Sequence, residues 1–254
     1  MTLFNGFDRI RIVNLPARAD RRAEMIGELR RIGLADDPRV KFVKGVSVPA
    51  DDMQPWRAPG EKGVFLAQLN VLRDAASANE SVLILEDDVD FTPAVQTWAR
   101  AENVDIAYGG YHASDPEHLE TSDIAGAHCI GFSARAAQAL VPFLEQLFDH
   151  PSPPPIDGAY VWFRRQREGF ATSFAIPVVA VQRPSRSDIT PNRTLDRFSF
   201  LHGPVGAARR IKRNLRRGGL TFGLPEAVII AIIGIAIASA AAYYHLHHGV
   251  AGHG

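Results

Sequence analysis

The residues best suited to chemistry are three consecutive carboxylates, Glu86-Asp87-Asp88, which directly follow the apolar run Ser81–Leu85. Such a run predicts a strand buried on both faces of a sheet. In open α/β sheets, ligands bind beyond the carboxyl ends of the strands, so these side chains are expected at the binding edge. Adjacent carboxylates repel one another and lose hydration on burial. A divalent cation, Mg²⁺ or Mn²⁺, would offset both effects, bridge the phosphates of a nucleotide and act as a Lewis acid. The alternative is a solvated acidic turn.

A second polar segment follows the first predicted strand, Arg9–Leu15. Asn14 is a candidate hydrogen-bonding partner for a base or ribose. Arg18 and Arg21 are candidates to pair with phosphate, because they lie near the start of a predicted helix. Arginines in a first helical turn are also commonly solvated, which is the alternative interpretation.

The elements that must position these residues alternate between strands and helices. Apolar runs and helical spacing predict six strands and four helices. The strands are Arg9–Leu15, Val40–Val46, Ser81–Leu85, Ile106–Tyr108, Cys129–Phe132 and Pro177–Val181, and the helices are Asp20–Ile32, Val64–Ala76, Ala134–Phe148 and Gly158–Arg167. This alternation predicts an α/β fold with a mainly parallel sheet and helices on both faces.

Several of these segments, in this order, resemble glycosyltransferase family 25, which includes lipopolysaccharide sugar transferases and procollagen galactosyltransferases. The segments are VNLPARADRRAEM, GEKGVFLAQLNVLRDA, VLILEDDVDF, HCIGFSARAAQALV, PIDGAY and VAVQRPSRSDIT, and they span about residues 9–190. The resemblance implies a GT-A-like fold, a nucleotide-sugar donor such as a UDP-hexose, and transfer with inversion.

An inverting transfer needs a base that takes a proton from the acceptor hydroxyl. Asp157 is the first candidate, with His112 and His128 as weaker ones. Asp157 could equally be the N-cap of the helix that follows. Ser187 and Asp188 are candidate donor contacts, although a local turn explains them as easily.

The sequence also departs from the family. The family usually has a cysteine and then a Ser-His pair after its glycine-glutamate step, whereas this chain has Val64 and Ala67-Gln68. The acidic turn PIDGAY also lacks the usual flanking residues. If the missing histidine serves the reaction, this chain uses another group or has lost activity.

The C-terminal part predicts a membrane anchor. Ala227–Tyr244 is uncharged and spans about 27 Å as a helix, close to the ~30 Å hydrocarbon thickness. Arg209–Arg217 holds six basic residues in nine, which places the large domain on the cytoplasmic side and favours anionic lipid. A buried core helix is the alternative. Gly234, Ala238 and Ala242 form a small-residue stripe of the kind that pairs helices, so a homodimer through this helix is a further hypothesis.

Charge is distributed unevenly along a chain whose formal net charge is zero. Residues 1–182 hold 25 acidic and 18 basic residues, whereas residues 183–217 hold 10 basic and 2 acidic ones. An acidic body argues against a nucleic-acid partner. The single cysteine, Cys129, excludes an intramolecular disulfide and suits a reducing compartment, and Met1–Phe7 shows no secretory signal.

Four segments are therefore expected. These are a transferase domain (1–182), a basic juxtamembrane arm (183–223), a transmembrane helix (224–246) and a His-rich tail (247–254). The prediction is a single-pass membrane protein with a cytoplasmic catalytic domain, which moves a hexose to a lipopolysaccharide- or lipid-linked glycan. The alternative is a catalytically silent relative that acts as a tethered binding or scaffold protein.

Overall fold

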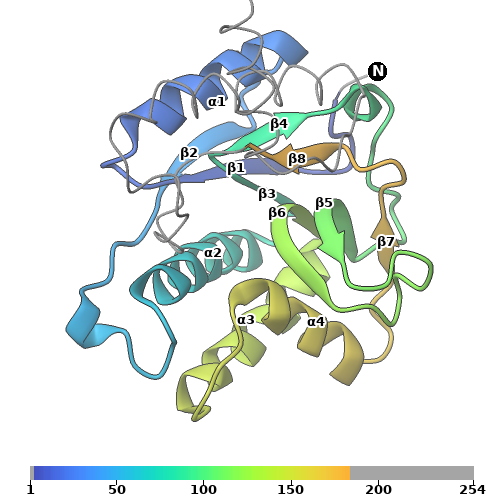
Figure 1. Ribbon diagram of the computed structural model, residues 1–254. Coiled ribbons are helices and arrows are strands. Elements are labelled where there is room, and N and C mark those ends of the chain that lie inside the picture. Colours follow the sequence, from blue (N-terminus) through green and yellow to red (C-terminus); the bar gives the residue numbers. More distant parts are fainter. Residues whose placement is uncertain (1–2, 184–254) are drawn as a thin grey trace, which may run out of the picture. The chain divides into compact units, whose positions relative to one another are not determined.

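A computed structural model describes residues 3–183 of the chain (Figure 1). The strands are β1 (Arg9–Asn14), β2 (Val40–Lys44), β3 (Val82–Glu86), β4 (Val89–Phe91), β5 (Ile106–Ala113), β6 (Ile124–Phe132), β7 (Thr172–Phe174) and β8 (Ala180–Gln182). The α-helices are α1 (Ala19–Ile32), α2 (Pro59–Ala78), α3 (Ala134–Gln146) and α4 (Ile156–Gln166), with short 3-10 turns at Ala50–Asp52, Pro93–Gln96 and Leu147–Asp149. The transmembrane helix, the basic arm, the tail and Asp188 lie outside these residues and stay predictions.

Six of the described strands form one sheet in the order β2-β1-β3-β6-β5-β7. β1 is parallel to both β2 and β3, and β5 is parallel to β7, whereas β6 runs antiparallel to its neighbours β3 and β5. The predicted mainly parallel α/β sheet is therefore confirmed. β4 and β8 form a separate antiparallel pair.

Helices cover both faces of the sheet, as predicted (Figure 1). One core cluster joins Leu83 and Leu85 of β3 to Met25 and Leu29 of α1. The opposite cluster contains Val82 and Ile84 of the same strand, packed with residues of α2, α3 and α4. β3 therefore buries both of its faces, because successive side chains of a strand point to opposite sides.

The helix ends follow local sequence signals. Gly33 ends α1 in the left-handed conformation, with a φ of 78°, as its position after Ile32 predicts. α2 begins at Pro59, five residues before the predicted Val64, because proline is favoured in a first helical turn and the apolar spacing begins only later. α4 begins at Ile156, so Asp157 lies within its first turn, and the N-cap alternative is wrong.

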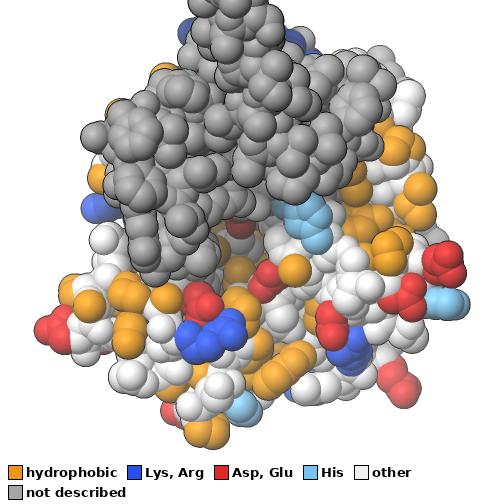
Figure 2. All heavy atoms as spheres, in the orientation of Figure 1, with side chains coloured by type: hydrophobic (Ala, Val, Ile, Leu, Met, Phe, Trp, Pro, Cys, Tyr) orange, Lys and Arg blue, Asp and Glu red, His pale blue; other side chains and the backbone are white. Residues whose placement is uncertain are grey.

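On the face shown in Figure 2, acidic, basic and hydrophobic side chains of the described residues are interspersed. Among residues 3–183, no helix is both long and apolar enough to cross a membrane.

Gly131 in β6 and Gly27 in α1 allow a matched test of the packing. A Cβ added at Gly131 would overlap the ring of Phe7, whereas one added at Gly27 would meet nothing within 4 Å. Gly131→Ala should lower the free energy of unfolding by about 1–3 kcal/mol through overpacking. Gly27→Ala should raise it by roughly 0.5–1 kcal/mol through reduced chain entropy.

The measurement is the urea concentration at the unfolding midpoint of the full chain in mild detergent, with tryptophan fluorescence as the signal. Equal midpoints for the Gly131→Ala variant and the wild type would contradict the packing of Phe7 against β6.

Candidate functional site

The carboxylate segment lies where the sequence predicts, at the carboxyl end of β3. β1 and β3 are parallel neighbours, with Val13 opposite Glu86, so Asn14 at the end of β1 lies beside Asp87. Arg21 reaches the same place from the first turns of α1, and Gln182 reaches it from the end of β8. Four elements distant in sequence therefore meet at one edge of the sheet.

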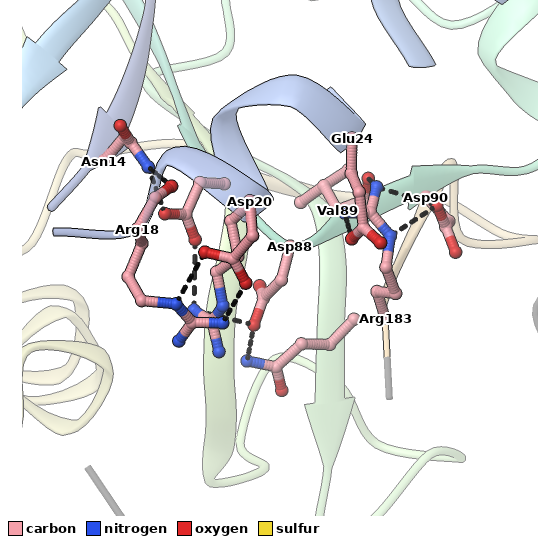
Figure 3. A network of polar contacts seen from close by, with 11 residues as sticks. Asn14, Arg18, Asp20, Glu24, Asp88, Val89, Asp90 and Arg183 are labelled. Atoms are coloured by element: carbon pink, nitrogen blue, oxygen red, sulfur yellow. Dashed lines mark hydrogen bonds and ion pairs between the residues drawn. The ribbon is translucent and has the colours of Figure 1, made fainter. Parts of the chain in front are cut away.

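Asp87 is held by hydrogen bonds on both of its oxygens. Asn14 Nδ2 donates to Asp87 Oδ2 at 2.7 Å, and Arg21 Nη1 donates to Asp87 Oδ1 at 3.1 Å. Asn14 Nδ2 also bonds the carbonyl oxygen of Arg18 at 3.1 Å (Figure 3). Asp87 is 6% exposed, so it acts here as an internal anchor that joins β1, α1 and β3.

Glu86 and Asp88 are less completely compensated than Asp87. Arg21 Nη1 lies 3.3 Å from Asp88 Oδ2. Gln182 Nε2 lies 3.3 Å from Glu86 Oε2 and 3.5 Å from Asp88 Oδ2. Within the described part of the chain, buried Asp88 Oδ1 has no hydrogen-bond partner. Glu86 is more exposed than Asp87 and Asp88.

Burial and mutual repulsion raise the pKa values of these two carboxyl groups. The pKa of Glu86 rises to about 8, first because of burial and then because of the charges of Asp88, Asp87 and Asp157. The pKa of Asp88 rises to about 6, mainly because of burial, and Arg21 limits the rise. Glu86 and Asp88 repel each other when both are charged. A cation bound to both would relieve this repulsion.

The structure also reveals site residues that sequence reasoning missed. The Arg183 backbone N–H donates to the Asp88 carbonyl oxygen at 2.6 Å. Its guanidinium, 3% exposed, contacts Asp90 at 3.0 Å and Glu24 at 2.7 Å, and also binds the Val89 carbonyl oxygen (Figure 3). Gln182 and Arg183 lie inside the segment VAVQRPSRSDIT, but their sequence positions did not show that this segment pairs with β4.

Asp157, the predicted base, lies close enough to Glu86 to raise its pKa. Both carboxylate oxygens accept backbone hydrogen bonds, Oδ2 from Gly126 at 2.7 Å and Oδ1 from Gly158 at 2.8 Å. These bonds fix the carboxylate between β6 and α4.

The other candidates are placed less directly. Buried His128 bonds the Ala180 carbonyl oxygen through Nε2 at 3.1 Å, and its ring lies 5.8 Å from that of exposed His112. Arg18 forms a two-point contact with Asp20, at 3.0 and 2.9 Å. Arg21 is thus the arginine of this segment that the structure brings to the carboxylates.

The positions of the missing Ser-His pair lie inside the protein. Ala67 is 3% exposed, and Gln68 is fully buried with its Oε1 accepting a hydrogen bond from the Tyr160 hydroxyl at 2.8 Å. Burial, and then the charges of Tyr108, Asp157 and Glu86, raise the pKa of Tyr160, so Gln68 lies near the carboxylate edge.

Among residues 3–183, no three His, Cys, Asp or Glu side chains are grouped closely enough to hold a metal ion. Asp87 is already engaged by Asn14 and Arg21. Glu86 and Asp88 fit a divalent cation better, because their contacts with Gln182 are long and, among these residues, Asp88 Oδ1 has no hydrogen-bond partner. The predicted metal ligands, Glu86, Asp87 and Asp88, remain a hypothesis.

No family model matches the chain, and no curated protein matches it either. One similar solved structure is the crystal structure of a glycosyltransferase involved in the glycosylation of the major capsid of PBCV-1. Its TM-score is 0.46 at 12% sequence identity, over 70% of this chain and 94% of that chain. A likeness of this degree does not identify the activity of this chain.

The raised pKa values predict how stability depends on pH. Glu86 and Asp88 favour protonation in the folded state, so their contribution is present below about pH 4 and is lost as pH rises through about 6 and 8. Asp88→Asn should make the free energy of unfolding depend less on pH, and should raise it at pH 8 in EDTA. Asp74→Asn, on the exposed surface of α2, should change it by less than about 0.5 kcal/mol.

Urea unfolding of the full chain at pH 5, 6, 7 and 8 measures this. An Asp88→Asn variant that is less stable than the wild type at pH 8 would show that the charged carboxylate stabilises the fold.

Proposed function

We propose that this chain is a metal-assisted glycosyltransferase that moves a hexose from a nucleotide-diphosphate sugar, such as a UDP-hexose, to a glycan acceptor. The observation that carries the proposal is the incompletely compensated pair Glu86 and Asp88 at the carboxyl edge of the sheet. Ligands bind at this edge in α/β folds. The ordered resemblance to glycosyltransferase family 25, with its GT-A-like fold, supports the same reaction.

Glu86 and Asp88 would hold Mn²⁺ or Mg²⁺, and a cation there supplies Lewis-acid stabilisation of the departing diphosphate. Arg21 contacts both Asp87 and Asp88, so it fixes the carboxylates and adds positive charge beside the phosphate position. Asn14, which is 6% exposed, donates to Asp87 through its amide nitrogen, and its amide oxygen would be the group that accepts from a nucleoside hydroxyl. Arg18 would contact phosphate only after releasing Asp20.

Asp157 is the proposed base for an inverting transfer. Backbone hydrogen bonds from Gly126 and Gly158 orient its carboxylate, and each oxygen retains a further lone pair. It would take the proton from the acceptor hydroxyl as that oxygen attacks the sugar. Asp188, beyond the described residues, stays a predicted donor contact.

A second candidate function is a catalytically silent domain that binds a sugar nucleotide or a protein. The observation that favours it is the burial of Ala67 and Gln68 where the family has a Ser-His pair. Neither side chain is exposed to a ligand, so this part of the site cannot act as a Ser-His pair would.

The decisive experiment is calorimetric titration of the full chain, in detergent, with UDP and UDP-hexoses in the presence and absence of Mn²⁺. We expect Mn²⁺-dependent binding in the wild type, because the cation neutralises both carboxylates and diphosphate. Asp88→Asn should weaken binding at least roughly ten-fold, whereas Asp74→Asn should leave it unchanged.

Release of a free hexose or labelling of a glycan then separates the two candidates. Binding without transfer to any acceptor favours the silent domain. No binding of any sugar nucleotide, with or without Mn²⁺, rejects the transferase.

We further propose that Leu224–Leu246 anchors the catalytic domain to the cytoplasmic face of a membrane. The support is the sequence alone, an uncharged run preceded by the basic segment Arg209–Arg217. Anchoring would confine the enzyme to the layer that holds a lipopolysaccharide- or lipid-linked acceptor and raise the effective concentration. Pairing of anchors through Gly234, Ala238 and Ala242 would make the protein a homodimer.

Deletion of Leu224–Gly254 tests the anchor. The shortened chain should move from the membrane pellet to the soluble fraction, because the remaining basic segment binds only through charge. Fractionation in low and high salt measures this. A shortened chain that stays in the pellet at high salt would contradict a single C-terminal anchor.

A further inference from the structure

Gln182 lies at the point where a cation would be expected. Its exposed side chain extends from the end of β8, with Nε2 3.3 Å from Glu86 Oε2 and 3.5 Å from Asp88 Oδ2. One amide nitrogen thus contacts both carboxylates that lack strong compensation. The contacts are longer than the usual 2.9–3.0 Å of an N–H···O bond.

The backbone of Gln182 is held firmly even though its side chain is exposed. Val89 of β4 pairs with Gln182, and the next residue, Arg183, binds the Asp88 carbonyl oxygen at 2.6 Å. The buried Arg183 guanidinium then ties this point to Asp90 and Glu24. The amide is therefore presented to the carboxylate edge by a fixed backbone.

The neighbouring contacts satisfy Asp87 but leave one oxygen of Asp88 without a hydrogen-bond partner among the described residues. Asp87 has both oxygens bonded, to Asn14 and Arg21. In the described residues, Asp88 Oδ1 is buried with no hydrogen-bond partner, although Asp88 is only 4% exposed. Two carboxylates therefore face the edge, where Arg21 contacts Asp88 and the Gln182 amide contacts both Glu86 and Asp88.

We propose that Gln182 is a third cation ligand that acts as an amide switch, an inference that rests on the proposed function. Without a cation, its NH₂ group links Glu86 and Asp88. When a divalent cation binds, the amide turns over and presents its carbonyl oxygen instead. Asp87 is then an anchor of the site and not a ligand.

The chemistry of the amide suits this role. A glutamine side chain carries two N–H donors and a carbonyl acceptor, and its terminal torsion has two broad, nearly equivalent orientations. N–H groups facing a cation are repelled, whereas amide carbonyl oxygens are normal ligands of hard cations. Two carboxylates and one neutral amide carry a total charge of −2, which equals the charge of a divalent cation in magnitude. A site without excess negative charge would let the cation dissociate after each reaction.

The test is a titration of the full chain with Mn²⁺, in which electron paramagnetic resonance measures the free Mn²⁺. The titration is done first without nucleotide and then with UDP. Gln182→Leu should weaken Mn²⁺ binding roughly ten- to hundred-fold. Gln182→Glu should bind Mn²⁺ at least as tightly as the wild type, because ligand charge raises affinity. Gln138→Leu is the matched control, since Gln138 contacts Asn79 and Ala76 far from the carboxylate edge in sequence and fold.

The outcomes separate the inference from the function on which it rests. A wild type that binds Mn²⁺ while Gln182→Leu binds it equally well overturns the switch and leaves the transferase intact. Loss of UDP binding in Gln182→Leu without any change in Mn²⁺ affinity likewise overturns it. A wild type that binds no Mn²⁺, even with UDP, removes both the switch and the metal-assisted transferase.

Discussion

The site depends on how the protein keeps three adjacent carboxylates at the end of a buried strand. Asp87 accepts hydrogen bonds from Asn14 of β1 and from Arg21 of α1. This arrangement holds the turn after β3 in place. Glu86 and Asp88 are less completely compensated, and burial together with the neighbouring carboxylates raises both of their pKa values.

A second ionic group completes the arrangement from the end of the described chain. Arg183 lies between Asp90 and Glu24, with its backbone bonded to the carbonyl oxygen of Asp88. Its burial is tolerable because two carboxylates and a carbonyl oxygen surround it. The pairing of β4 with β8 is thus coupled to the position of Asp88, so a segment about 94 residues away in sequence determines the geometry of the site.

Much of this arrangement could be predicted from local patterns, and the remainder could not. The apolar run before Glu86 gave the correct strand and edge, and Gly33 gave the correct end of α1. Contacts set by tertiary packing have no such local signal. Periodicity cannot show that Gln182 meets Glu86, that Asp87 is used internally, or that α4 begins one residue before Asp157. For the same reason, the three carboxylates seemed equivalent in the sequence although the fold gives them different partners.

The contrast between Asp87 and Asp88 argues that the edge serves a ligand. A carboxylate retained only for stability would be expected to resemble Asp87, with both oxygens bonded and a neighbouring arginine. Asp88 instead combines burial, a raised pKa and an oxygen without a partner among the described residues. In natural proteins, a buried group that lowers stability in this way is found mainly at functional positions. Positive charge would relieve this conflict, and that is the physical reason for proposing a cation, and a diphosphate bound through it, at this edge.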